Sequence, residues 1–276
     1  MQNPKGSSKK IREYLYKVNP KATDSLLILF ERNNIIYYTN SKRNRKAIDS
    51  LNLIITKINS NFENHKEKYI ALTSEKEFQM ARQHVRILTQ HSKAMRGNFK
   101  NYSDMRDFYM AENVKWILKH EGEDQKIMLW AHNEHIRKTN NTHKRMGYFL
   151  SKDFKENYFA IGFEFYSGEF QARVNINRKK PDSLLITKYS SIIKNSLASR
   201  LVKSRKINYY LDLTLLNKAQ REVKSYFLKK QRHHVIGATF NPKNKWFGFE
   251  KRNVSEMYDG LIFIRNTTNS VPINHK

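Results

Sequence analysis

Apolar residues in the first third of the chain recur at every third or fourth position, which is the spacing that places side chains on one face of an α-helix. The clearest stripe consists of Ile48, Leu51, Ile55, Ile58 and Phe62. A helix with one apolar face needs other elements to cover that face. The stripe therefore predicts an amphipathic helix that belongs to a helical subdomain.

Two more helices are predicted further along the chain. The second begins at a capping box, in which Ser74 and Glu77 are placed to bond to each other's backbone N–H groups. Its apolar positions are Phe78, Ala81, Val85 and Leu88. The third runs from about Asp104 to His120, and its apolar face holds Met110, Val114, Ile117 and Leu118. Together the three patterns predict a mainly helical subdomain over residues 1–121.

Beyond Gly122 the apolar residues form short runs, which are typical of β-strands. The first run, Lys126–Trp130, precedes a helix predicted near Thr142–Ser151. Further strands are predicted over Tyr158–Phe165, Glu169–Val174, Ile207–Leu213, Val235–Phe240 and Gly260–Ile264, with a turn at Ser167–Gly168 and helices near Ser190–Val202 and Ala219–Leu228. Strands that alternate with helices predict a layered α/β sheet, part of it parallel, over residues 122–276.

The chain carries 52 Lys and Arg residues against 25 Asp and Glu residues, a formal net charge of +27. Such a charge is typical of proteins that bind nucleic acid, because lysine and arginine neutralise phosphates. The basic clusters are short, however, and no nucleic-acid recognition motif accompanies them. They are spread over residues 42–46, 178–180, 203–206 and 229–232. A solvated basic surface is the favoured interpretation, and a non-catalytic protein that binds nucleic acid or another polyanion is the alternative.

Several absences narrow the possible functions. The sequence contains no cysteine, which excludes disulfides, thiolate metal sites and a cysteine nucleophile. No apolar run approaches the length of a membrane span, and no signal peptide is visible over Met1–Lys17. We therefore expect a cytoplasmic protein without a membrane partner.

Four polar residues, His132-Asn133-Glu134-His135, follow the predicted strand Lys126–Trp130 after Ala131. Ligands in open α/β sheets bind beyond the carboxyl ends of the strands, which is where this segment would lie. An imidazole can transfer a proton near neutral pH, donate a hydrogen bond to an oxyanion or bind a metal. On the residues alone, a catalytic site and a polar loop with only local hydrogen bonds are equally open.

A metal site would need at least three protein ligands. His132 and His135 could supply two, and the sources of a third are Glu164, Asp212 and the pair His233-His234. The sequence has no HExxH motif, so a divalent-metal site is the less favoured alternative. No other role is predicted for His233 and His234. A serine hydrolase is also disfavoured, because the sequence has no Gly-x-Ser-x-Gly motif.

Arg106 and Asn113 are seven residues apart in the third predicted helix, so both lie on the same helical face. A polar pair on a largely apolar stripe can line a binding site. A surface arginine at the first turn of the helix is the simpler interpretation, and position alone favours it.

Several stretches share their order and spacing with one known family. They are Ile11–Pro20, Met105–Trp116, LWAHNEHI, Met146-Gly147, YFAIGFEFYSGEF and YDGLIFIRNTT. Over residues 1–270 the chain resembles the erythromycin esterase family. The resemblance implies a three-layer α/β fold with flanking helices and a helical insertion. It also implies an enzyme in which water hydrolyses an ester, best known as the lactone ring of macrolide antibiotics.

The resemblance also implies roles for individual residues. His132 and His135 would be catalytic residues that bind or polarise the substrate and the water. Asn133, Glu134, Arg106 and Asn113 would bind the substrate. A small-molecule ester is the implied partner, and no cofactor is implied.

The sequence departs from the family at one motif. The family's Gly-Glu-x-x-His-Gly motif, whose histidine and acidic neighbours activate the water, does not occur in these 276 residues. We therefore expect an incomplete domain, the carboxyl-terminal part of an esterase-like protein. We expect it to be inactive or strongly impaired, because a positioned general base contributes about 10²- to 10⁴-fold to the rate.

Overall fold

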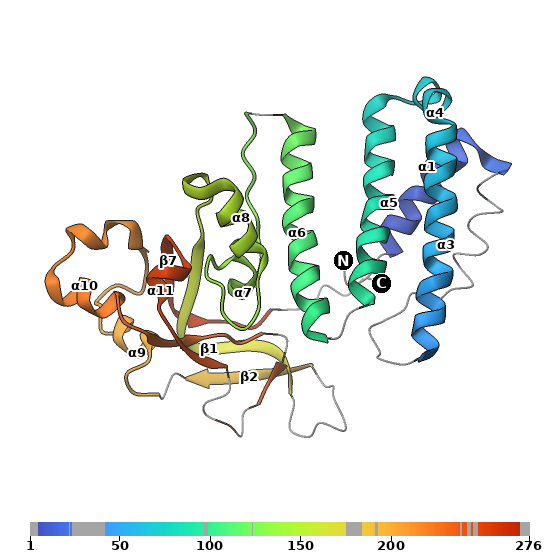
Figure 1. Ribbon diagram of the computed structural model, residues 1–276. Helices are drawn as coiled ribbons and strands as arrows, with labels where there is room; N and C mark the ends of the chain where they lie inside the picture. The colour runs from blue at the N-terminus through green and yellow to red at the C-terminus, as the bar shows by residue number, and fades with distance from the viewer. Residues whose placement is uncertain are drawn as a thin grey trace. The chain divides into compact units, whose positions relative to one another are not determined.

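The computed structural model describes residues 5–21, 23, 42–96, 99–122, 124–174, 184–190, 193–237, 239–241, 244 and 248–270. The chain divides into two compact units, residues 1–120 and 121–276. The first unit is helical, and the second carries the β-sheet (Figure 1).

The described part of the helical unit consists of helices that range from 7 to 23 residues in length (Figure 1). They are α1 (Lys5–Val18), α3 (Lys42–Asn64), α4 (Lys66–Leu72), α5 (Glu75–Met95) and α6 (Phe99–Glu121), the last of which ends at the boundary of the unit. The three helices predicted from apolar periodicity are confirmed as α3, α5 and α6.

Apolar periodicity identified the buried faces of α3 and α5 but not that of α6. The stripes of α3 and α5 are buried almost throughout, including Ile48, Ile55, Ile58, Phe62, Phe78, Ala81, Val85 and Leu88. In α6, Val114 is buried, but Ile117 is 40% exposed. The buried residues of α6 also include Asp107 and Ala111, so its buried face is partly polar.

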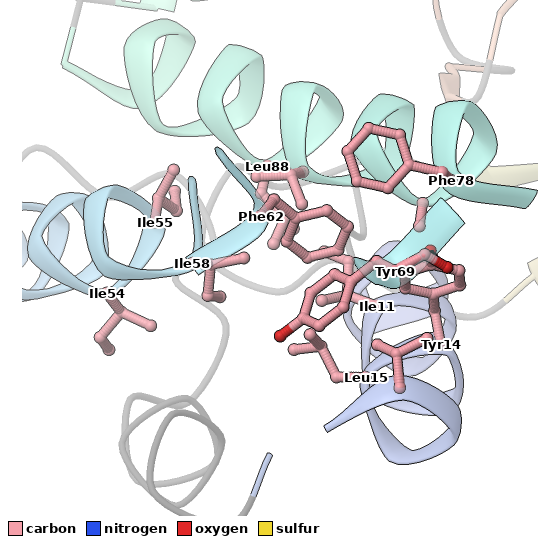
Figure 2. Close-up of a cluster of buried hydrophobic side chains, with 13 residues drawn as sticks. Ile11, Tyr14, Leu15, Ile54, Ile55, Ile58, Phe62, Tyr69, Phe78 and Leu88 are labelled. Carbon is pink, nitrogen blue, oxygen red and sulfur yellow. Dashed lines mark hydrogen bonds between the residues drawn. The ribbon is translucent and has the colours of Figure 1, made fainter. Parts of the chain in front are cut away.

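The core of the helical unit is centred on aromatic rings from several helices (Figure 2). The ring of Phe62 from α3 stacks on Tyr14 of α1 at 5.6 Å between centroids. It also contacts Tyr69 of α4 edge-on at 5.9 Å and Phe78 of α5 at 5.8 Å. Edge-on and stacked pairs of this kind are favourable beyond the area that they bury. Phe62 therefore links four helices of this unit, α1, α3, α4 and α5.

One half of the predicted capping box of α5 is present: the Oγ of Ser74 accepts a hydrogen bond from the N–H of Glu77 at 3.1 Å, whereas the carboxylate of Glu77 accepts from Lys17. Ser74→Ala is expected to lower the free energy of unfolding by about 1 kcal/mol, since it leaves one helix-terminal N–H without its acceptor. Urea denaturation followed by circular dichroism measures this change. Ser50→Ala, in the interior of α3, is the control. It is expected to be neutral or slightly stabilising, and an equal loss in both variants would contradict the capping role.

The second unit contains short helices around its strands (Figure 1). The helices are α7 (Asn133–Ile136), α8 (Met146–Phe154), α9 (Leu197–Leu201), α10 (Arg221–Phe227) and α11 (Val254–Met257), with 3-10 turns η1 (Lys155–Asn157) and η2 (Leu213–Lys218). The strands are β1 (Ile161–Val174), β2 (Leu184–Ser190), β3 (Asn208–Asp212), β4 (Gln231–His234), β5 (Thr239–Phe240), β6 (Phe249–Arg252) and β7 (Gly260–Thr267).

The main sheet has the strand order β2-β1-β7-β3, and β5 pairs with the end of β1. Its central pair, β1 and β7, is parallel, with Phe163 opposite Ile262. The outer strands β2 and β3 are antiparallel to their neighbours, and β4 and β6 form a separate antiparallel pair. The prediction of an α/β sheet that is parallel in part is confirmed.

β1 is one long strand where the sequence predicted two strands and a turn at Ser167-Gly168. Gly168 has a φ of 129°, and a Cβ at this position would overlap the backbone of Thr267 in β7. Only glycine combines this backbone conformation with so close an approach of the neighbouring strand. Gly168 therefore marks a local distortion within a continuous strand, and the predicted turn is wrong.

The prediction of a strand over Lys126–Trp130 is also wrong. These residues have no regular secondary structure, and no described strand pairs with them. Met128 is 90% exposed and Trp130 is 85% exposed, although the Trp130 ring contacts Phe163 edge-on at 5.5 Å. A strand forms only where a neighbour takes up its backbone hydrogen bonds. An apolar run alone does not supply that neighbour.

The remaining predicted elements are present with shifted ends. Ile207–Leu213 and Gly260–Ile264 are confirmed as β3 and β7, and the three predicted helices of this unit appear as α8, α9 and α10. The predicted strand Val235–Phe240 is reduced to β5. Across the described ranges, no helix combines the length and the apolar character that crossing a bilayer requires.

Candidate functional site

His132 lies at the N-terminus of α7, where its own ring caps the helix. Its Nδ1 accepts a hydrogen bond from the N–H of Glu134 at 3.3 Å. Its Nε2 lies 2.5 Å from the carbonyl oxygen of Ile236. Because Nδ1 accepts and a carbonyl can only accept, this network assigns the hydrogen to Nε2. The ring is exposed and presents an N–H donor.

Asn133 attaches the same loop to the edge of the main sheet. Its Oδ1 accepts from the N–H of Phe163 at 3.0 Å, and its Nδ2 donates to the carbonyl oxygen of Phe163 at 2.7 Å. The side-chain amide thus pairs with β1 as a neighbouring strand would. This attachment fixes the position at which α7 begins.

Glu134 is the centre of a partly buried charge network. One carboxylate oxygen accepts from Nε of Arg137 at 3.1 Å, and the other accepts from Nη1 of Arg252 at 2.7 Å. Burial by itself would raise the pKa of Glu134, but the charges of Arg252 and Arg137 outweigh it and hold the pKa below its ordinary value. Glu134 is therefore an ion-pair partner in the folded protein.

Arg137 is 1% exposed, so its guanidinium depends on internal partners. Besides Glu134, it donates to the backbone carbonyls of Thr139 and His143. Tyr158 supports the same turn, because its hydroxyl donates to the carbonyl oxygen of Ile136 at 2.6 Å. Burial raises the pKa of Tyr158, which keeps this hydroxyl protonated.

His135 occupies the third position of α7 and is half-buried. Its backbone N–H donates to the carbonyl oxygen of His132 at 2.8 Å. The two imidazoles therefore belong to a single turn of helix, where the sequence predicted a loop after a strand.

A second buried group of polar residues lies in the same unit. His234 of β4 bonds to Glu164 of β1 through Nδ1, and its backbone N–H donates to the same carboxylate at 3.2 Å. The ring of His234 stacks on Phe165 at 4.8 Å between centroids. Glu164 and His234 are both almost completely buried, so this pair has the arrangement of a base and its orienting carboxylate without access for a substrate.

His233 connects the two groups electrostatically. Burial lowers its pKa, and the charges of Glu164, Arg252, Glu134 and His234 all act on it. Its side chain is 2% exposed, and its Nε2 has no hydrogen-bond partner among the described residues. From the sequence, His233 and His234 had no predicted role other than as a possible third metal ligand. Two features of the sequence could have indicated this group. One is the pair of adjacent histidines in a stretch of strand length, and the other is the single carboxylate in the apolar run YFAIGFEF.

In the part of the chain that the structure describes, no three His, Asp or Glu side chains are grouped so that they could hold a metal ion. Of the third ligands considered, Glu164 is bonded to His234, and Asp212 caps η2 by accepting from the N–H of Thr214 at 2.9 Å. The geometry of the described residues thus offers no support for the divalent-metal alternative.

Arg106 and Asn113 lie on α6, in the helical unit. Arg106 is near the buried Asp107, with 3.8 Å between Nη1 and Oδ2. Asn113 bonds through its side chain to Gln83 and Gln90 of α5. The prediction that these residues bind substrate together with the histidine loop stays a prediction.

The model of the erythromycin esterase family matches residues 1–267. The chain belongs to the erythromycin esterase family. Two proteins are similar in sequence to parts of this chain. The Bacillus subtilis protein YbfO is 25% identical over 181 residues, which are 61% of this chain and 36% of YbfO. Erythromycin esterase type II of Escherichia coli is 33% identical over 82 residues, 28% of this chain and 20% of that protein.

Solved structures resemble this member of the erythromycin esterase family over almost its whole length. A Bacillus cereus protein matches with a TM-score of 0.75 at 20% identity, covering 96% of this chain and 64% of its own. A mutant of the erythromycin esterase EreC in its open conformation matches with a TM-score of 0.61 at 16% identity, covering 96% of this chain and 66% of its own. The fold is therefore shared, and this chain spans two thirds or less of each relative.

Proposed function

We propose that this chain is an ester hydrolase, or the part of one, in which water attacks an ester or macrolide lactone beside His132 and His135. Membership of the erythromycin esterase family supports the reaction class. The hydrogen bond from His132 to Ile236 supports the role of His132 as an oxyanion donor. A ring N–H that donates to a backbone carbonyl can also donate to an ester carbonyl. Attack by water places negative charge on that ester oxygen, and a positioned donor stabilises it.

The surroundings of His132 favour this role over that of a general base. Nδ1 accepts from the N–H of Glu134, so the available hydrogen is on Nε2. In this proposal the ester carbonyl takes the N–H in place of the carbonyl of Ile236, which requires the Ile236 backbone to move away from the exposed ring. His135, in the same turn, contacts the substrate or the water in this proposal.

Asn133 and Glu134 contribute indirectly in this proposal. Asn133 already bonds to Phe163 through both polar atoms of its amide, and Glu134 bonds to an arginine through each oxygen. They hold the loop so that His132 keeps its orientation. Arg106 and Asn113 remain candidates for substrate contacts from the helical unit.

In this proposal the general base that activates the water is not among these 276 residues. No Gly-Glu-x-x-His-Gly motif occurs in the sequence. Hydrolysis of p-nitrophenyl acetate or of a macrolide lactone by this chain should therefore be close to the buffer rate. It should rise when the chain is expressed with a family segment that carries the motif. Rapid hydrolysis by the 276-residue chain alone would show that the base lies elsewhere.

His132→Ala is expected to lower kcat/KM of the motif-containing protein by about 10²-fold, the effect of losing one oxyanion donor. Initial rates with both esters measure the change. His143→Ala is the matched control, since it removes an imidazole from the following loop and leaves the backbone carbonyl that accepts from Arg137. Unchanged rates in His132→Ala would reject the role of His132.

The alternative, binding of nucleic acid or another polyanion, rests on net charge. The basic clusters within the described residues lie at the start of α3, after α9 and at the start of β4, while the cluster at 178–180 lies outside them. No specific observation in the structure favours this alternative over ester hydrolysis.

A further inference from the structure

The helical unit contains a polar pocket of about 400 Å³. Five of its seven lining residues come from α5, one from α3 and one from α6. Trp116 of α6 is the single aromatic residue among them, and the others carry amide, hydroxyl or guanidinium groups. All seven lining residues belong to the helical unit, whereas the histidine loop belongs to the other unit.

α5 has two faces with different chemistry. Its apolar face enters the core shown in Figure 2, where Phe78 and Leu88 are labelled. Its pocket face carries Gln79, Arg82, Gln83 and Arg86, which also follow the spacing of three and four residues. A helical period in these polar residues means that they share one surface of the helix.

A chain of three side-chain amides runs behind this surface. Nε2 of Gln83 donates to Oδ1 of Asn113 at 2.8 Å, and Nδ2 of Asn113 donates to Oε1 of Gln90 at 3.0 Å. The chain is open at both ends, because Oε1 of Gln83 and Nε2 of Gln90 have no partner among the described residues. Gln83 is 5% exposed, and leaving such a buried acceptor unsatisfied costs about 1–3 kcal/mol. Gln83 also lines the pocket, so a ligand could satisfy this buried oxygen once the amide turns toward the pocket.

The open end of the amide chain matches a hydroxyl group. Amide nitrogen and oxygen are distinguished only by their hydrogen bonds, so all three amides could be reversed together. Gln83 would then offer a donor to the pocket in place of an acceptor. A hydroxyl serves both cases, since it donates one hydrogen bond and accepts others.

The charges at the pocket favour a neutral ligand. Arg82 forms an ion pair with Glu63 and donates to Oδ1 of Asn59 at 3.3 Å. Arg86 lies 3.6 Å from a carboxylate oxygen of Glu112. Each guanidinium therefore already faces a carboxylate, while it keeps further N–H donors for polar groups. An anionic ligand would compete with these carboxylates, and a neutral one would not.

Trp116 supplies the remaining feature of the pocket, an aromatic surface. Its ring stacks on His120 at 4.6 Å between centroids with an angle of 14°, which holds the indole in place. The C–H faces of a sugar ring pack on such a surface, while the hydroxyl groups at the rim reach amides and guanidinium groups.

We propose that the helical unit binds a neutral saccharide of one or two rings in the pocket between Gln83, Arg86 and Trp116. The pocket volume lies at the small end of the range of about 300–1,000 Å³ for small-molecule sites, which suits one or two rings better than a polymer. This site does not depend on ester hydrolysis by the other unit.

The test is ligand-observed saturation-transfer NMR on the 276-residue chain with methyl β-D-glucopyranoside and with maltose. Saturable binding of at least one sugar is expected, with little change between low and high salt, because no net charge is neutralised. Inorganic phosphate is the anionic probe and is expected not to compete. Absence of saturable sugar binding, or displacement of the sugar by phosphate, would overturn the proposal.

Variants locate the binding. Trp116→Leu and Gln83→Met are each expected to weaken sugar binding at least about tenfold, the effect of losing roughly 1.4 kcal/mol of interaction. Arg96→Ala is the matched control, since Arg96 lies at the end of the same helix and pairs with Asp49 outside the pocket. If Gln83→Met unfolds by circular dichroism, Arg86→Ala replaces it, because that side chain is half exposed. Equal affinity in the control and in Trp116→Leu would reject this pocket as the site.

Discussion

Glu134→Gln is expected to lower the free energy of unfolding of the sheet-bearing unit by about 3–5 kcal/mol, the cost of removing one partner from a buried ion pair. Arg137 is 1% exposed, so its charge would remain inside the protein without a counter-charge. The carbonyls of Thr139 and His143 would still accept from it, which places the expected loss near the lower end of the range. Urea denaturation followed by circular dichroism measures the difference.

The effect of Glu134→Gln has a pH dependence of known sign. The folded-state pKa of Glu134 lies below its ordinary value, because Arg252 and Arg137 outweigh the effect of burial. The unfolded chain has the ordinary glutamate pKa of about 4.3. The stabilisation is therefore complete above about pH 4.3 and is lost as the pH falls through the folded-state pKa. The difference between wild type and variant should be constant near neutrality and shrink in acid.

Glu222→Gln is the control for this measurement. Glu222 is an exposed glutamate in the first turn of α10, in the same unit. A change within about 0.5 kcal/mol is expected, as for most surface substitutions. A loss from Glu134→Gln no larger than that of the control would mean that the two arginines do not depend on Glu134.

Gly147→Ala is expected to destabilise the histidine loop by about 3 kcal/mol, the upper end of the range for overpacking. A Cβ on Gly147 of α8 would overlap the carbonyl group of Ile136 and lie 2.7 Å from the carbonyl oxygen of Arg137. Both carbonyl groups belong to the backbone, which cannot rotate away as a side chain can. Alanine itself favours a helix by up to about 1 kcal/mol over glycine, so a net loss would show that the contact with α7 decides the outcome.

Thermal denaturation of Gly147→Ala, compared with Gly237→Ala, tests this contact. A Cβ on Gly237 would meet nothing within 4 Å. The control is therefore expected to keep the wild-type melting temperature, and Gly147→Ala to melt lower. A Gly147→Ala variant as stable as wild type would mean that α7 and α8 can separate without loss, and that the orientation of His132 is not held by this contact.

Local sequence patterns were sufficient for most of the helical unit. The stripe that ends at Phe62 and the cap at Ser74 each depend on residues within a few positions of one another, and both are present as predicted. Helical periodicity and capping are determined by neighbours three and four residues away. For this reason α3 and α5 could be located without knowledge of the rest of the chain.

Strand predictions were less reliable, because a strand depends on a partner that the local sequence does not specify. Gly260–Ile264 became β7 because β1 and β3 lie on either side of it. Lys126–Trp130 has a comparable apolar run, yet no described strand pairs with it. The difference lies in the neighbours and not in the run itself.

The sequence by itself determined the family and the three helices α3, α5 and α6, and it singled out the His132-Asn133-Glu134-His135 segment. Only the tertiary structure decided what these residues contact. Glu134 meets Arg252, 118 positions away, and His132 meets the carbonyl of Ile236, 104 positions away. Periodicity describes interactions within a few residues, whereas the partner of a buried charge or an imidazole is set by how distant segments pack together.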